Sequence, residues 1–190
     1  MQKTDIKLKH IFFVHSAGSQ GGSGEGSFDL VSTLETELSS DYHIQYPVIN
    51  NPEVPTYQTW KKLFSFKLKE YTEPLILVGH SLGGSVLLKY LSEEKVDISI
   101  VGLFLISIPH WGKKDWEVEE FVLPENFETK LRHISNVFLY HSKNDEIVPF
   151  EHLSFYKNAF PNATVRELEG KDHAFARGLP VLVADIKSQR

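Results

Sequence analysis

The chain has 190 residues, of which 41% are hydrophobic and 24% are charged. These proportions are near the averages for soluble globular domains, and they exclude a mainly disordered chain. The net charge of −5 and the scattered lysines and arginines argue against a surface for nucleic acid or anionic membranes. Because the chain has no cysteines, disulfides, thiolate catalysis and cysteine metal sites are excluded too.

The N-terminal segment has a charged start followed by apolar residues, which is also how a secretion signal begins. Its apolar stretch runs only over residues 11–14, which is too short for a signal peptide. No stretch approaches the roughly 20 apolar residues of a membrane helix. We therefore expect a cytoplasmic protein without membrane insertion, and the length predicts a single domain over residues 1–190.

Strand and helix patterns alternate along the whole chain. Before residue 92 we predict strands over 9–15, 42–46 and 75–78 and helices over 27–38, 56–71 and 85–91, with Thr56 as an N-cap. After it we predict strands over 98–108, 137–141 and 163–168 and helices over 150–160 and 179–187. The alternation predicts an α/β fold, a doubly wound and mostly parallel sheet with helices on both faces.

The long apolar run over 98–108 does not alternate with polar residues, which is typical of a strand in a parallel sheet covered on both faces. The segment that follows, over 109–133, has no regular pattern and is predicted to be a small insertion. It carries the aromatic residues Trp111, Trp116, Phe121 and Phe127. It begins at the carboxyl edge of the sheet, where ligands bind in open α/β sheets. We therefore expect Trp111 to contact a substrate, unless these rings only cover the sheet edge.

The pentapeptide Gly79-His80-Ser81-Leu82-Gly83 fits the pattern G-x-S-x-G, with a predicted strand before it and a helix after it. In that context the serine lies on a sharp, strained turn, and small neighbours prevent collisions where the chain reverses. Free N–H groups at the start of the helix suit a negatively charged oxygen forming beside Ser81. The simpler interpretation is a tight turn with a serine N-cap.

A serine hydroxyl needs a base, and the base needs a group that orients it. Asp145 follows the strand over 137–141, and His173 follows the strand over 163–168, so serine, acid and histidine come in the expected chain order. Glu146 or Asp172 could be the acid instead, although Asp172 adjoins His173 in sequence. The nine histidines show no spacing typical of metal ligands.

The motifs GHSLGG, SKNDEIVP and GKDHAF together resemble the α/β-hydrolase superfamily. The short chain is most similar to the small YdeN-like serine hydrolases, which include the retinoblastoma-binding serine hydrolases. This resemblance implies a compact fold with little or no lid. It also implies Ser81 as the nucleophile, Asp145 as the orienting acid and His173 as the base.

The family's first loop usually reads His-Gly-x, and the corresponding residues here are His15-Ser16-Ala17. The resemblance implies that the N–H groups of Ala17 and Leu82 form the oxyanion hole, and we expect His15 to contact the substrate. Ser16 replaces the glycine of the family pattern. Serine tolerates fewer backbone conformations than glycine does, so this replacement bears on the shape of the loop.

We expect a serine hydrolase that cleaves a small-molecule ester or thioester and needs neither a metal nor an organic cofactor. The sequence identifies no protein partner. One alternative is a protein-binding module on a hydrolase scaffold with little or no activity, because fold alone does not establish function. Another keeps the same catalytic groups for different chemistry, such as C–C bond cleavage or hydroxynitrile lysis.

Overall fold

The computed structural model describes residues 8–189, in which strands and helices alternate as predicted. The strands are β1 (Lys9–Val14), β2 (Tyr42–Gln45), β3 (Leu75–His80), β4 (Ile100–Ile106), β5 (Val137–Ser142) and β6 (Thr164–Leu168). The helices are α1 (Phe28–Leu38), α2 (Tyr57–Lys67), α3 (Leu82–Glu93), α4 (Phe127–Lys130), α5 (His152–Ala159) and α6 (Pro180–Lys187). Two short 3-10 turns are η1 (Leu68–Glu70) and η2 (Glu119–Phe121).

The strands form one six-stranded sheet in the order β2-β1-β3-β4-β5-β6, and every neighbouring pair is parallel. The first strand, β1, lies inside the sheet; from there the chain moves outward to β2 and then crosses back to β3 and on to β6. Strand order therefore reverses between β1 and β3, and open α/β sheets bind ligands beside such a reversal. This arrangement confirms the predicted doubly wound fold.

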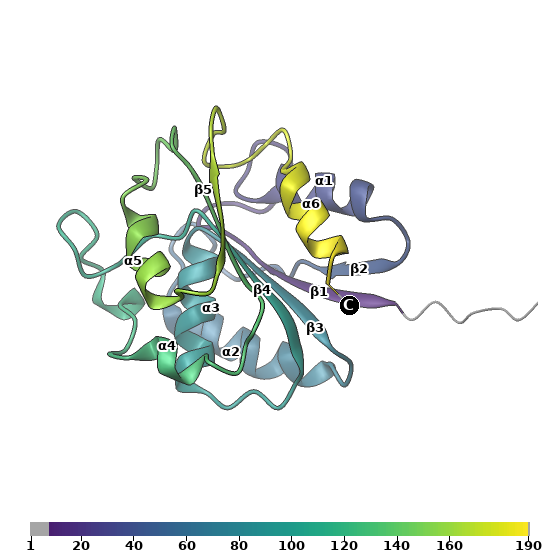
Figure 1. Cartoon of the computed structure of the whole chain (residues 1–190), viewed down its shortest axis with the longest axis horizontal. Coiled ribbons are helices and arrows are strands. Elements are labelled where there is room, and N and C mark those ends of the chain that lie inside the picture. The colour runs from purple at the N-terminus through teal and green to yellow at the C-terminus, as the bar shows by residue number, and fades with distance from the viewer. Residues whose placement is uncertain (1–7, 190) are drawn as a thin grey trace, which may run out of the picture.

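Helices cover both faces of the sheet (Figure 1). α2, α3 and α5 lie on one face, and α1 and α6 lie on the other. In β1, Phe12 and Val14 point to the first face while Ile11 and Phe13 point to the second, because successive side chains of a strand alternate. Both faces are apolar, which explains why the strands read as continuous apolar runs.

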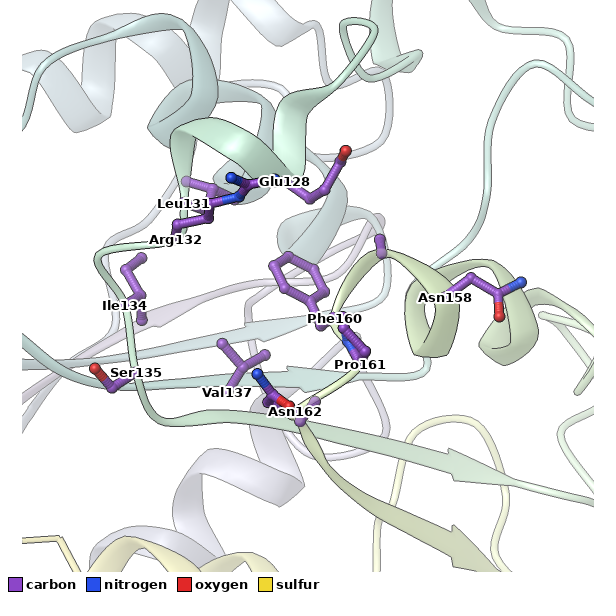
Figure 2. A pocket seen from close by; sticks show the side chains of 12 residues that line it. Glu128, Leu131, Arg132, Ile134, Ser135, Val137, Asn158, Phe160, Pro161 and Asn162 are labelled. Carbon is purple, nitrogen blue, oxygen red and sulfur yellow. The ribbon is translucent and has the colours of Figure 1, made fainter.

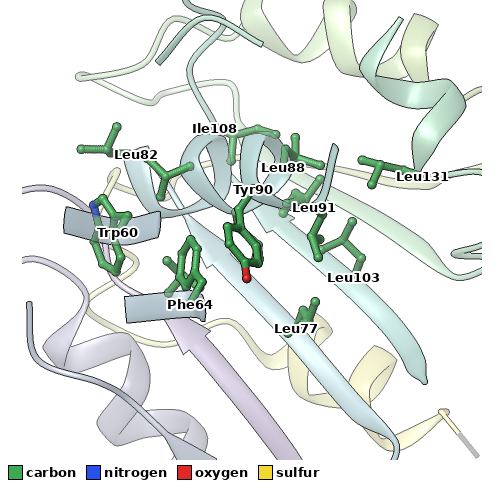
Figure 3. Close-up of a cluster of buried hydrophobic side chains, with 14 of the residues drawn as sticks. Trp60, Phe64, Leu77, Leu82, Leu88, Tyr90, Leu91, Leu103, Ile108 and Leu131 are labelled. Carbon is green, nitrogen blue, oxygen red and sulfur yellow. The ribbon is translucent and has the colours of Figure 1, made fainter. Parts of the chain in front are cut away.

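Each face of the sheet carries one cluster of buried hydrophobic side chains, and the larger cluster lies on the face covered by α2, α3 and α5. This larger cluster holds the serine-bearing part of the fold in place. Figure 3 shows Trp60 and Phe64 of α2 packed beside α3, above strands that carry Leu77 and Leu103. Thr56 caps α2 as predicted, because its side chain accepts the N–H of Thr59 at 3.2 Å. α3 is therefore buried between α2 and the sheet, and its first turn is fixed by packing.

Several element boundaries differ from the predictions, and those of β4 and α3 bear on the serine turn. β4 is two residues shorter at each end than the predicted strand, and at its carboxyl end Ser107 takes a left-handed backbone with φ 45°, which ends the strand. α3 begins at Leu82 rather than at residue 85, because the two glycines after Leu82 are part of the helix. The serine thus directly precedes the first helical residue.

Between β4 and β5 the chain forms η2 and α4, two short helical segments among irregular turns. Phe121 and Phe127 are buried in the larger cluster, so this segment packs down onto the sheet. Within residues 8–189 no helix has the length and apolar character that crossing a lipid bilayer requires.

Candidate active site

Loops from four strands meet at the carboxyl edge of the sheet. Ala17 follows β1, Ser81 follows β3, Asp145 follows β5 and His173 follows β6. Parallel pairing places the ends of these strands along one edge, so residues far apart in sequence share one surface. The positions predicted from the chain order therefore lie on the same side of the molecule.

Ser81 lies in a strained turn. Its backbone has φ 53° and ψ −127°, a region that non-glycine residues rarely occupy. The turn is held by two backbone hydrogen bonds, from Ser81 N–H to the Ile106 carbonyl at 2.8 Å and from Gly84 N–H to the Ser81 carbonyl at 3.0 Å. Such strain persists where the surroundings impose it, and here it lifts a serine above the start of α3.

Asp145 and His173 form a close pair. Nδ1 of His173 lies 2.9 Å from both carboxylate oxygens of Asp145, whose side chain is fully buried. The same carboxylate accepts the backbone N–H groups of Ile147 at 3.0 Å and Val148 at 2.8 Å. His141 Nε2 lies 3.6 Å away. The carboxylate is thus fixed before it meets the ring of His173.

The surroundings keep Asp145 ionised. Burial by itself raises the pKa of this carboxyl group, but the hydrogen bond and charge of His173 outweigh burial, and the pKa is lowered to about 2. The hydroxyl of Ser107 lies beside the carboxylate and favours the same form, although its geometry completes no hydrogen bond. An anion at this place stabilises a positive charge on the His173 ring.

The two other candidate acids lie apart from that ring. Glu146 accepts the backbone N–H of His173 at 3.2 and 3.3 Å, and Asp172 accepts the N–H of Ala176 at 3.2 Å. Neither carboxylate bonds to the imidazole of His173. Of the three acids left open by the sequence, the structure brings Asp145 to the ring.

With Nδ1 engaged by Asp145, Nε2 is the nitrogen of His173 that remains for Ser81. In residues 8–189 no hydrogen bond joins the Ser81 hydroxyl to His173. Such bonds are often long without substrate and tighten when it binds. The Ser81 and His173 side chains retain a small exposure to solvent, so both are reachable from outside.

Ala17 and Leu82 offer free backbone N–H groups. Within the described residues neither N–H donates a hydrogen bond, and Leu82 is the first residue of α3. The loop of Ala17 takes its left-handed conformation at Gly18, with φ 93°, and Ser16 has no positive φ. The serine in place of the family glycine therefore carries no backbone strain.

His15 lies inside the protein. Its ring is fully buried, with Nε2 2.7 Å from the Gly18 carbonyl and Nδ1 2.8 Å from the Tyr46 hydroxyl. Both nitrogens thus bind the loop itself, and no atom of the ring faces solvent. This contradicts the expectation that His15 contacts a substrate, because its partners are internal. Its geometry is that of a residue that shapes the Ala17 loop.

Trp111 belongs to an aromatic group on the segment after β4. Its ring is partly buried, 5.1 Å from Trp116 in an edge-to-face arrangement and 5.0 Å from Phe121. Trp116 in turn lies 5.1 Å from the ring of His152. The segment is anchored beside α3, because Ser85 donates its hydroxyl proton to the Pro109 carbonyl. Trp111 therefore stands at the sheet edge that carries Ser81.

Sequence reasoning missed most partners of the central residues. Tyr46 contacts the ring of His15 and Ser107 lies beside Asp145, yet neither belongs to a recognisable motif. Glu146 was predicted only as an alternative acid, and it contacts the backbone of His173 instead. His80 is fully buried and lies with its ring 5.1 Å from that of His173. The one sequence feature that could have pointed to His80 is its place inside the serine motif, at a position where any residue is allowed.

Acid should destabilise the fold through His80. Burial, followed by the nearby His173 ring, lowers the pKa of His80 from 6.5 to about 3. Between these values the unfolded chain binds a proton at His80 that the folded chain does not bind, so stability falls as the pH falls. The free energy of unfolding should lose about 1.4 kcal/mol per pH unit from this group.

Urea unfolding of the native chain and of His80→Gln, at about pH 4 and pH 6, measures this effect. The glutamine variant should show a shallower dependence of the unfolding free energy on pH, by about one proton. Equal slopes in the two proteins would mean that His80 is protonated in the folded state.

A large hollow lies elsewhere on the molecule. Figure 2 shows a cavity lined by Val137, Phe160 and Arg132 among others, and its volume is about 670 Å³. Val137 begins β5 and Ala163 precedes β6, so this cavity is at the amino edge of the sheet, opposite Ser81. Size alone therefore does not mark the reactive site of this protein.

Within residues 8–189 no group of histidine, aspartate and glutamate side chains is arranged to hold a metal ion.

Comparisons with known proteins identify the family and the fold. A family model described as serine hydrolase matches residues 29–176. The chain is similar to the ydeN gene product from B. subtilis, with 22% identity, a TM-score of 0.80, and 95% of this chain and 98% of that chain covered. This likeness confirms the resemblance predicted from the motifs.

Two further solved structures share the fold. Est1E from Butyrivibrio proteoclasticus, solved with ferulic acid bound, has 14% identity and a TM-score of 0.72, covering 98% of this chain and 89% of that one. An α/β serine hydrolase without lid from Xanthomonas campestris has 16% identity and a TM-score of 0.65, covering 98% and 84%. No curated protein sequence matches this chain significantly. Identities this low establish the fold and leave the substrate open.

Proposed function

Because the chain belongs to the serine hydrolase family, we propose that it cleaves a small ester or thioester through an acyl-enzyme on Ser81. The observation that carries this proposal is a strained serine at the same sheet edge as a buried carboxylate that holds a histidine ring. The structural neighbour Est1E was solved with ferulic acid, a carboxylic acid, and acids are the product class of ester cleavage.

The first half of the reaction forms the acyl-enzyme. Oγ of Ser81 attacks the acyl carbon while its proton passes to Nε2 of His173. Asp145 accepts the Nδ1–H of the ring and stabilises the imidazolium. The N–H groups of Ala17 and Leu82 donate to the oxygen that becomes negatively charged. The imidazolium then gives its proton to the leaving alcohol or thiol, and the acyl group stays on Ser81.

The second half releases the acid. His173, neutral again, takes a proton from a water molecule as the water attacks the acyl carbon of the intermediate. The same two N–H groups hold the second oxyanion. When the bond to Oγ breaks, His173 returns the proton to Ser81. The cycle thus restores the free enzyme and consumes one water molecule.

A fluorophosphonate probe and a substrate panel test this proposal. An activated Ser81 should be labelled covalently, and labelling should stop when the serine is replaced. p-Nitrophenyl esters and thioesters of increasing acyl length should report which bond is cleaved fastest. A chain that neither labels nor hydrolyses any member would instead support a binding module on a hydrolase scaffold.

Asp145→Asn should lower kcat/KM for an ester by about a hundredfold or more. The amide cannot stabilise the imidazolium and favours the wrong tautomer of His173. Glu146→Gln and Asp172→Asn are matched controls with far smaller losses, because neither carboxylate reaches the ring. Steady-state kinetics of the three variants checks this, and equal losses at positions 145 and 172 would contradict the assignment.

The substrate pocket should be short. The segment between β4 and β5 forms η2 and α4 and packs down onto the larger cluster, so it covers little beyond the sheet edge. The neighbour from Xanthomonas campestris is described as lacking a lid. We therefore expect short to medium acyl chains to react fastest, without activation at lipid droplets. Fastest hydrolysis of long-chain triglycerides, rising sharply above their solubility limit, would contradict this.

Trp111→Ala should change the preference for acyl length more than it lowers stability. The ring stands with Trp116 and Phe121 at the edge that carries Ser81, so removing it should widen the acyl site. The measurement is the hydrolysis rate against acyl length, with the melting temperature of each protein. Phe160→Ala is the matched control, because it removes a ring at the opposite edge and should leave the preference unchanged. Identical profiles for the native chain and Trp111→Ala would show that the ring only covers the sheet.

A further inference from the structure

We propose that His80 is a positioning residue, whose imidazole ties both the loop of His173 and the loop of Ala17 to the serine turn. This inference rests on the proposed function, because it assigns His80 a task in the same reaction. His80 is the last residue of β3 and directly precedes Ser81. The groups that bind the His80 side chain are therefore held at a fixed distance from the nucleophile.

The contacts form a continuous chain across the site. Nε2 of His80 lies 2.8 Å from the backbone carbonyl of His173, and Nδ1 lies 2.9 Å from the Ser27 hydroxyl. That hydroxyl also accepts the backbone N–H of Ser16 at 3.0 Å, next to Ala17. Ring and hydroxyl are fully buried. One side chain thus connects three loops that follow three different strands.

The hydrogen bonds assign the protons. A carbonyl oxygen only accepts, so Nε2 of His80 carries the hydrogen and donates it to His173. Nδ1 then has a free lone pair, which accepts the proton of the Ser27 hydroxyl, because Ser16 Oγ, the other acceptor within reach of that hydroxyl, lies farther away at 3.2 Å against 2.9 Å. The Ser27 oxygen keeps a lone pair for the N–H of Ser16. Every group in the chain is satisfied with a neutral ring, as burial requires.

His173 is held at three points, and His80 supplies the one nearest the nucleophile in sequence. Asp145 binds the ring, Glu146 accepts the backbone N–H, and His80 donates to the backbone carbonyl. Without the last contact, Nε2 of His173 would be fixed relative to β5 but no longer to the serine turn. A shift of about 1 Å between reacting groups can cost a hundredfold in rate.

Plain packing does not account for this arrangement. A buried site beside Phe175 would accept an apolar ring of similar size, and the serine motif allows any residue at this position. Instead both nitrogens of His80 meet partners of matching polarity on loops of the site. A buried polar chain of this kind fixes relative position, because each unpaired member would be costly.

The experiment compares His80→Leu, His80→Gln and Ser27→Ala with the native chain. His80→Leu removes both contacts and should lower kcat about 10- to 100-fold with KM changed less than about twofold. His80→Gln keeps a donor for the His173 carbonyl and should recover a large part of that loss. Ser27→Ala leaves the serine turn untouched and should lower kcat less than His80→Leu.

Two readouts separate positioning from general stability. Tyr140→Phe is the matched control, because it removes one buried hydrogen bond, from the Tyr140 hydroxyl to Asp185 of α6. This bond lies away from the site, so the variant should keep the native kcat. Proton NMR observes the hydrogen on Nδ1 of His173 that faces Asp145, and this signal should shift or broaden in His80→Leu but not in Tyr140→Phe. The NMR readout does not require turnover.

Several results would overturn the proposal. One is a native kcat in His80→Leu, and another is an equal loss of kcat in His80→Leu and His80→Gln. A third is a loss of kcat in Tyr140→Phe as large as that in His80→Leu when the two variants have the same melting temperature. An unchanged Nδ1 proton signal in His80→Leu would do so as well. If the native chain hydrolyses no ester and takes up no probe, the proposed function fails, while the NMR comparison still decides whether His80 positions His173.

Discussion

Ser81→Ala should lower the rate of ester hydrolysis at least a thousandfold while the chain stays folded. Alanine fits the same turn, because it has the same Cβ and meets the same backbone geometry, so only the hydroxyl is lost. Activity should therefore fall to the level that the oxyanion N–H groups and substrate binding alone provide.

Steady-state hydrolysis of a short p-nitrophenyl ester measures this loss, and melting curves establish that the fold is kept. Ser92→Ala is the matched control, because it removes a hydroxyl from the same helix, where Ser92 bonds only to the Lys89 carbonyl. The control should hydrolyse and label like the native chain. Native turnover in Ser81→Ala, with matching melting curves, would show that the nucleophile lies elsewhere.

The positions of Ser81, Asp145 and His173 could be predicted because each follows a strand. In a parallel sheet the residue after a strand is at the carboxyl edge, whatever the length of the intervening chain. Recognising three strands and their order was therefore enough to predict that these residues share one edge. The family resemblance, and not strand order, pointed to Ala17 and Leu82, whose expected contribution comes from the backbone and depends little on the side chain.

Side-chain partners could not be predicted in the same way. The burial of His15 depends on how the loop after β1 folds back, with Gly18 left-handed and Tyr46 of a neighbouring loop against the ring. Glu146 meets the backbone of His173 rather than its ring because the turn after β5 directs two adjacent carboxylates differently. These outcomes follow from loop conformation, which no sequence periodicity encodes.

The extent of β4 shows the same limit on a smaller scale. Apolar residues continue past Ile106, so the pattern predicts a longer strand, but Ser107 adopts a left-handed backbone and the chain turns away. That turn brings the Ser107 hydroxyl beside Asp145. A hydrophobic run reports which residues are buried, and it does not report where the backbone leaves the sheet.

Gly83→Ala should lower the free energy of unfolding by more than about 3 kcal/mol. A Cβ on Gly83 would lie 2.2 Å from the His15 carbonyl oxygen and 2.4 Å from that of Val14. Both atoms are backbone at the end of β1, so no side-chain rotation relieves the contact. Either α3 or the loop after β1 must move, although the sheet and the buried face of α3 hold them together.

Urea unfolding of Gly83→Ala and of Gly22→Ala tests this expectation. Gly22 is the matched control, because a Cβ there meets no atom within 4 Å and its substitution should change stability by less than about 0.5 kcal/mol. Whatever fraction of Gly83→Ala folds should also hydrolyse esters poorly, because the displaced His15 carbonyl is two residues from the N–H of Ala17. A native melting temperature with native activity in Gly83→Ala would mean that α3 does not approach β1 as closely as this, and the oxyanion site would then have to be placed differently.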